Sequence, residues 1–149
     1  MTHSFRSHYF HLIWSTRNRV PLITKENQSS LYAYMGGVIK NYDGKLMEAG
    51  GTFDHVHLLV GLSLPDKFSD LVRDVKTNSS LWLKKNSTQQ YFAWQEGYGS
   101  FSVSYSSLEK VKHYIKNQKE HHKTKSFDEE YLQLLKKHKI PYDTRFVLG

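Results

Sequence analysis

The chain has no cysteine among its 149 residues. Disulfide bonds and thiolate metal sites are therefore excluded. No apolar run approaches the roughly 20 residues that a membrane-spanning helix needs. The N-terminal residues 1–8 contain no apolar segment of the kind found in signal peptides, so we expect a cytoplasmic protein without a membrane partner.

Acidic residues are the scarcer charged class. The 14 Asp and Glu residues stand against 21 Lys and Arg residues, which gives a formal net charge of +7. This excess favours a polyanionic partner such as nucleic acid. Repeats, linkers and low-complexity segments are also lacking, and the length suits one domain with a real core. We therefore expect a single domain over residues 1–149.

Hydrophobic periodicity predicts the order strand, helix, strand, strand, helix, strand and then two further helices. We expect strands at 9–15, 45–52, 54–62 and 100–105, a short extra strand at 91–94, and helices at 24–42, 67–85, 106–125 and 126–139. The first six elements match the split βαβ, ferredoxin-like arrangement, an α+β fold. Such an antiparallel sheet carries helices on one face and leaves the other face open for a ligand.

Several local signals support these boundaries. Thr24 is a plausible N-cap for the first helix. Residues 106–109 and 126–129 both resemble capping boxes that begin the two C-terminal helices. Gly50 and Gly51 predict a bend or bulge near the end of the second strand.

Two histidines occupy one face of the strand at 54–62. Strand alternation sends His55 and His57 to one side, while Val56, Leu58 and Val60 can enter a core on the other. Two imidazoles on one face can share a divalent metal ion. A pair of polar surface residues is the simpler reading of this pattern taken alone.

A tyrosine and a glutamine stand one helical turn apart further along the chain. Tyr114 and Gln118 lie four residues apart and therefore on one helix face. They present a phenol beside a neutral oxygen donor. Together with a metal-binding histidine pair, this indicates phosphodiester chemistry with a tyrosyl nucleophile.

These motifs resemble a known family. His55-Val56-His57 resembles the histidine-hydrophobic-histidine (HUH) motif, and Tyr114 to Gln118 resembles the single catalytic tyrosine with its following glutamine. Residues 70–80 and 92–104 also resemble segments of the small HUH single-tyrosine transposases of bacterial insertion sequences. The resemblance runs from about residue 9 to residue 145.

The resemblance implies a mechanism. His55, His57 and Gln118 would bind Mg²⁺ or Mn²⁺, and Tyr114 would attack a phosphorus to give a 5′-phosphotyrosine and a free 3′-hydroxyl. The implied substrate is single-stranded DNA with hairpins near the ends of a mobile element, which the enzyme cleaves and rejoins. The family also implies a homodimer whose active sites combine the histidines of one subunit with the tyrosine helix of the other.

Other residues are candidates for contacts with DNA or metal. The candidates for phosphate contacts are Arg17, Arg19, Arg73 and Lys76. Trp94 and Tyr98 could stack on bases or belong to the core. His121 and His122 are read as surface residues that could serve as spare ligands, and Asp54 as a residue that could orient a ligand or simply begin a strand.

Alternative functions remain open at this stage. A domesticated HUH endonuclease would act on chromosomal palindromes, and the DNA flanking the gene would reveal it. A non-catalytic module for single-stranded nucleic acid would bind without metal or covalent product. A replication or conjugation nuclease is disfavoured by the short chain, and a structural zinc protein by the absence of cysteine.

Overall fold

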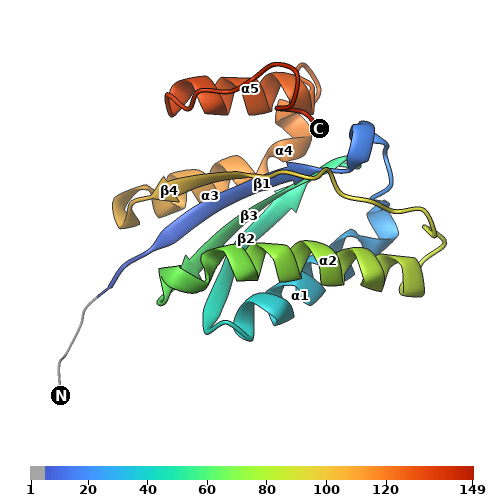
Figure 1. Ribbon diagram of the computed structural model, residues 1–149, viewed down its shortest axis with the longest axis horizontal. Helices are drawn as coiled ribbons and strands as arrows, with labels where there is room; N and C mark the ends of the chain where they lie inside the picture. The colour runs from blue at the N-terminus through green and yellow to red at the C-terminus, as the bar shows by residue number, and fades with distance from the viewer. Residues whose placement is uncertain (1–5) are drawn as a thin grey trace.

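The computed structural model describes residues 6–149. A four-stranded antiparallel sheet with the order β2-β3-β1-β4 lies at its centre (Figure 1). The strands are β1 (Tyr9–Ser15), β2 (Gly44–Gly51), β3 (His55–Leu62) and β4 (Gly99–Val103). This topology confirms the α+β, ferredoxin-like fold predicted from the element order.

Helices surround the sheet. They are α1 (Lys25–Lys40), α2 (Phe68–Asn86), α3 (Leu108–Lys116), α4 (Gln118–His121) and α5 (Phe127–Lys137), with 3-10 turns η1 (Arg17–Arg19), η2 (Pro65–Lys67) and η3 (Tyr105–Ser107). Within residues 6–149, none of these helices combines the length and apolar character needed to cross a membrane.

The main core lies between the sheet and the helices α1 and α2. Leu12, Val56 and Leu58 point from the central strands into this core and are fully buried. Thr24 caps α1 as predicted, because its hydroxyl accepts a hydrogen bond from the backbone N–H of Asn27 and the Asn27 side chain accepts one in return.

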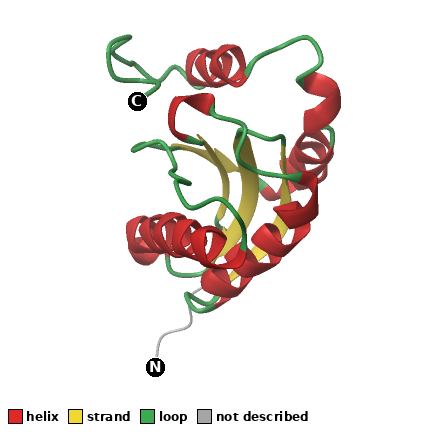
Figure 2. Ribbon diagram, turned by 90° about the vertical axis from the view of Figure 1, so that its right-hand side faces the viewer, coloured by secondary structure: helices red, strands yellow, loops and turns green. Residues whose placement is uncertain are grey.

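The opposite face of the sheet is covered rather than open. In Figure 1, α4 and α5 lie on the other side of the sheet from α2, and Figure 2 shows helices on both sides of the strands. Leu59 packs under Ile115 of α3, and Ile13 packs under Phe127 and Tyr131 of α5. The expectation of an open face was wrong because α3 and α5 each bury an apolar stripe there.

A glycine permits the close approach of α3 to the sheet. A Cβ atom added to Gly50 would lie 2.2 Å from the carbonyl oxygen of Ile115. Only glycine therefore lets the tyrosine-bearing helix pack at this distance. The irregularity predicted at Gly50 and Gly51 occurs earlier in β2, where the register shifts between Leu46 and Glu48.

Three local predictions were wrong. Residues 91–94 form no strand, and only Trp94 makes an isolated bridge, with Thr16. The helix predicted to run to residue 125 breaks at Asn117, which has φ −98° and ψ 25°. No side-chain hydrogen bond caps α3 at Ser107, because the 3-10 turn η3 leads directly into the helix.

Candidate active site

The histidine pair lies at the beginning of the inner strand β3, beneath the C-terminal helices. His55 and His57 project from β3 to the same side, as the alternation predicted, and both are 0% exposed. On its far side, His55 Nδ1 lies 2.8 Å from Asp54 Oδ1 and 3.0 Å from the Thr52 hydroxyl. Asp54 is therefore placed to orient this imidazole from behind.

Gln118 meets the histidines directly. The break at Asn117 turns this side chain inward, where it is 1% exposed. Its Oε1 lies 2.9 Å from His55 Nε2 and 3.0 Å from His122 Nε2. His122 is half-buried within this group, so its interpretation as a surface residue was wrong, whereas His121 is exposed.

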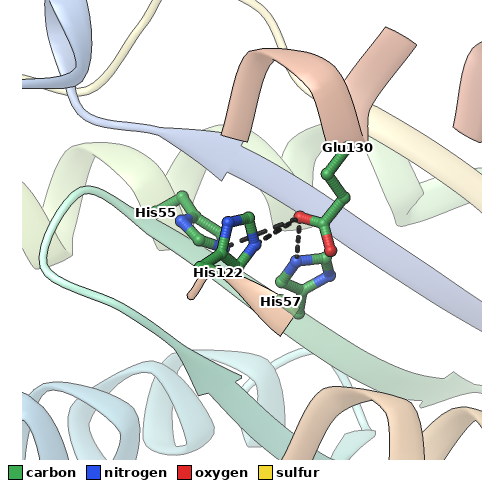
Figure 3. A group of neighbouring side chains, drawn as sticks. All are labelled: His55, His57, His122 and Glu130. Atoms are coloured by element: carbon green, nitrogen blue, oxygen red, sulfur yellow. Dashed lines mark hydrogen bonds and ion pairs between the residues drawn. The ribbon is translucent and has the colours of Figure 1, made fainter. Parts of the chain in front are cut away.

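Glu130 of α5 contacts the histidines and Tyr114, although no sequence motif predicted it. Its Oε1 lies 3.0 Å from His57 Nε2 and 3.1 Å from His122 Nε2. The Tyr114 hydroxyl donates a hydrogen bond to Oε2 of the same carboxylate. Figure 3 shows the three imidazoles and Glu130 pointing toward one another.

A signal for Glu130 was present in the sequence. Phe127, Tyr131 and Leu135 form the apolar stripe of α5, and Glu130 lies on the same face. A carboxylate at a core-facing position is rarely left without partners. Here it is 2% exposed and is held by His57 of β3, Tyr114 of α3 and His122, which follows α4.

His11 was also missed. It projects from β1 beside His57, and its Nε2 lies 2.7 Å from His57 Nδ1. Burial, reinforced by the nearby His57, lowers the pKa of His11 to about 3. Burial also lowers the pKa of His57 to about 4, although Glu130 opposes this effect. Both imidazoles are therefore neutral at neutral pH, the form that binds metals.

The carboxylate and the phenol have opposite pKa shifts. Burial raises the pKa of Glu130, but hydrogen bonds from His122 and His57 outweigh it and hold the pKa well below the usual range. Burial and the charge of Glu130 both raise the pKa of Tyr114 above its ordinary value. The pair therefore consists of an ionised carboxylate that accepts from a neutral phenol.

The donor set fits a divalent metal ion. His55, His57, His122 and Glu130 each offer one ligand atom, and these atoms lie within 4.8 Å of one another. Gln118 Oε1 adds a neutral oxygen beside two of them. Mixed imidazole and oxygen donors suit several first-row divalent ions, so the residues present fit a metal without selecting one.

The predicted DNA-binding residues lie in different settings. Arg17 and Arg73 are exposed, and Arg73 pairs with Asp70 and Asp74. Arg19 is half-buried between Asp128 and the carbonyl oxygen of Leu148. Their contacts with phosphate stay a prediction.

Lys76 and Trp94 have internal partners. Lys76 Nζ donates to the carbonyl oxygens of Gln95, Glu96 and Gly97. Trp94 is buried at 6% exposure, and its indole N–H donates to Ser79, which makes it a core residue in this structure. Tyr98 is exposed beside Phe68, and its contact with bases stays a prediction.

Two cavities flank the cluster beneath α5. The first, of about 690 Å³, is lined by His122 and Asp54 and by the beginning of α5 at residues 126–128. The second, of about 460 Å³, is lined by Tyr114 and His11 and by the end of α5 at Leu134 and Lys137. Glu130 lies between residues 126–128, which line the first cavity, and Leu134 and Lys137, which line the second.

Solved structures with the same fold include two transposases. A candidate transposase from Deinococcus radiodurans R1 is 22% identical, with a TM-score of 0.65 over 79% of this chain and 95% of that chain. A REP-associated tyrosine transposase bound to a REP hairpin is 16% identical, with a TM-score of 0.57 over 77% of this chain and 70% of that chain. Curated proteins gave no significant match.

A family match covers most of the chain. The family described as "Transposase IS200 like" matches residues 4–118. This segment contains the histidine pair and ends at Gln118, so His122 and Glu130 lie beyond it. Since the match spans well over half of the sequence and agrees with the fold, the chain belongs to the IS200-like transposases.

Proposed function

We propose that this transposase cleaves and rejoins single-stranded DNA beside hairpins through a covalent 5′-phosphotyrosine on Tyr114. The observation that carries the proposal is the shared carboxylate: Glu130 contacts both the Tyr114 hydroxyl and His57. The nucleophile and the candidate metal ligands thus meet at one point. The solved REP-associated relative, which is bound to a hairpin, supports the substrate class.

His55, His57 and Gln118 would hold the metal ion, with Glu130 and His122 as additional donors. When bound, Mg²⁺ or Mn²⁺ would polarise the scissile phosphate and offset the charge that develops on it. His57 Nδ1–H would then donate to His11 Nε2, because its Nε2 is engaged. Asp54 would hold the His55 ring in the same manner.

The covalent step uses groups already in contact. The Tyr114 oxygen bonds to phosphorus, the bond to the 3′-oxygen breaks, and that oxygen takes a proton from water. The phenol proton passes to Glu130 Oε2, to which it is already hydrogen-bonded, and from there to the hydroxide that this water leaves behind. Attack of a 3′-hydroxyl on the phosphotyrosine reverses the step, so rejoining needs no ATP.

A covalent adduct tests this function. Incubation with hairpin-bearing single-stranded DNA and Mg²⁺ or Mn²⁺ should give a protein–DNA species stable to denaturant, and EDTA should prevent it. Tyr114→Phe should abolish the adduct while leaving DNA binding largely intact. An adduct of undiminished yield with the Phe variant would show that another residue is the nucleophile.

The proposal includes a homodimer with shared sites, as the family resemblance implies. β4 is an edge strand and offers unpaired backbone groups to a second copy. Within a single chain, Tyr114 already lies beside His57, so an exchange of helices would recreate the same contacts between subunits. The alternative is a site built within one subunit.

Mixing two inactive variants separates these arrangements. His57→Ala and Tyr114→Phe chains should each fail to form adduct alone. If the sites are shared, re-equilibrated heterodimers should regain cleavage with the adduct on the His57→Ala chain, identified by a size tag. Proven heterodimers without adduct would place each site within one subunit, and a monomer by light scattering would reject the dimer.

A further inference from the structure

The larger of the two cavities, which is lined by His122, can be placed relative to the reacting groups. In a phosphoryl transfer, the attacking and leaving oxygens lie roughly in line on opposite sides of the phosphorus. Tyr114 lines the smaller cavity and does not line the larger one. With the scissile phosphate placed over the histidine cluster between the two cavities, in-line attack by Tyr114 would direct the leaving 3′-oxygen toward the larger cavity, beside His122.

The size and walls of the larger cavity suit a nucleotide. Its volume of about 690 Å³ lies within the ~300–1,000 Å³ typical of small-ligand sites. Phe53, at the turn between β2 and β3, lines the cavity with its side chain 57% exposed. An exposed aromatic ring in such a wall offers a stacking surface that tolerates any base.

The charges around this cavity favour an anion. Its two carboxylates are already engaged: Asp54 bonds to His55, and Asp128 pairs with Arg19. Lys25 and Lys119 also line the cavity, are exposed, and belong to none of the ion pairs among residues 6–149. Cations of this kind supply the phosphate contacts of a bound strand.

We propose that this cavity binds the nucleotide immediately 5′ of the cleavage point, with its base on Phe53 and its phosphate facing Lys25 and Lys119. The proposal rests on the proposed function, because the cavity is assigned from the direction of attack by Tyr114. It adds a product-strand subsite that holds the 3′-hydroxyl in place for rejoining.

Binding of the product strand isolates the subsite from the chemistry. The probes are an oligonucleotide that ends in the 3′-hydroxyl at the mapped cleavage point and the same oligonucleotide with an abasic terminal residue. Affinity is measured by fluorescence anisotropy in a Tyr114→Phe background. Phe53→Ala should weaken binding of the intact strand by about tenfold, within the range for loss of one stacked base, and Phe53→Trp should restore it.

The abasic strand supplies the decisive comparison. It should bind the Phe53-containing protein about tenfold more weakly than the intact strand does, and Phe53→Ala should cause no further loss. Tyr91→Ala is the matched control, because Tyr91 is 92% exposed on the loop between α2 and β4. This control should bind like the parent, and thermal unfolding should show that all variants are folded.

The outcomes distinguish a failure of the subsite proposal from a failure of the proposed function. If Phe53→Ala leaves binding unchanged, or weakens the abasic and intact strands equally, the subsite is wrong even where the wild type forms its adduct. If the wild type forms no adduct with any hairpin substrate, the proposed function fails, and the assignment of this cavity fails with it.

Discussion

The two faces of the sheet are built on opposite principles. The face beneath α1 and α2 buries aliphatic and aromatic side chains such as Leu12 and Leu58. The face beneath α3 to α5 buries a polar group centred on His57, Glu130 and Tyr114. Burial of apolar area stabilises a fold, whereas buried ionisable groups seldom improve on a well-packed apolar core. The polar centre of the second face is therefore explained by chemistry, whereas the apolar residues around it, such as Ile13 and Leu59, stabilise the packing of α5 and α3.

His57 and Leu58 are neighbours on β3 and point to opposite faces of the sheet. Substitutions of these two residues therefore test the contrast between the faces most strongly. His57→Ala should reduce adduct formation by more than about 100-fold, because loss of a metal ligand should exceed the 10–100-fold cost of losing a residue behind it. Added Mn²⁺ should raise the Tm of the wild type and should raise that of the variant less. Adduct formation by His57→Ala at the wild-type rate would remove His57 from the site.

Leu58→Ala, one residue further, tests the other face. It should lower the free energy of unfolding by about 2–5 kcal/mol because it leaves a cavity in the main core. Cleavage per folded molecule should change little at a temperature where the variant stays folded. Denaturant unfolding and active-site titration measure the two effects, and a selective loss of activity with unchanged stability would contradict the contrast.

Glu130→Gln tests the role of the carboxylate that α5 contributes to the site. The substitution keeps the shape of the side chain but removes the charge and most of the proton affinity, so adduct formation should fall by about 100-fold. DNA affinity in a Tyr114→Phe background should hold or increase, because one negative charge near the phosphate is lost. Glu129→Gln, on the exposed side of the same helix, is the control. Equal effects of the two substitutions would show that Glu130 does not accept the proton of Tyr114.

Alanine substitutions at two glycines should have opposite effects. Gly50→Ala should push α3 away from the sheet, since the new Cβ would lie 2.2 Å from Ile115 O. Small displacements of a nucleophile cost up to about 100-fold in rate. Gly37→Ala in α1 meets nothing within 4 Å and should stabilise the protein by about 0.5–1 kcal/mol. Unimpaired cleavage by Gly50→Ala would show that α3 can shift freely.

Lowering the pH should reduce the stability of the folded protein through the buried histidines of the polar face. The folded-state pKa values of His11 and His57 lie at about 3 and about 4, below the ordinary 6.5. Between pH 6.5 and 4 the unfolded chain therefore binds more protons, and the stability of the folded state falls as pH falls. In EDTA each of the two histidines should contribute a loss on the order of 3 kcal/mol. His11→Phe should give a shallower pH dependence, and an equally steep one would contradict the assignment.

The sequence predicted the elements whose partners are local or periodic. The alternation of β3 placed His55 and His57 on one face, and it placed Val56, Leu58 and Val60 in the main core on the other. The family motifs ended at Gln118. Glu130 and His122 could not be placed, because their roles depend on how α5 folds back over the sheet, a tertiary contact that no local period encodes.

The wrong predictions have similar causes. Trp94 carries a strand-like pattern, yet it is an isolated bridge whose indole is fixed by the core residue Ser79. The Tyr114 helix was expected to run without a break to residue 125. The break at Asn117 instead turns Gln118 toward His55, a geometry set by the site rather than by propensity.

In the proposed mechanism Tyr114, held by Glu130 beside the histidine pair, is the covalent nucleophile. Labelled hairpin DNA is incubated with the wild-type protein and Mn²⁺, the adduct is digested, and the peptide that carries the nucleotide is sequenced by mass spectrometry. We expect the modification on Tyr114 alone, and only in the presence of metal. A nucleotide on any other residue, or cleavage without a covalent peptide, would contradict it.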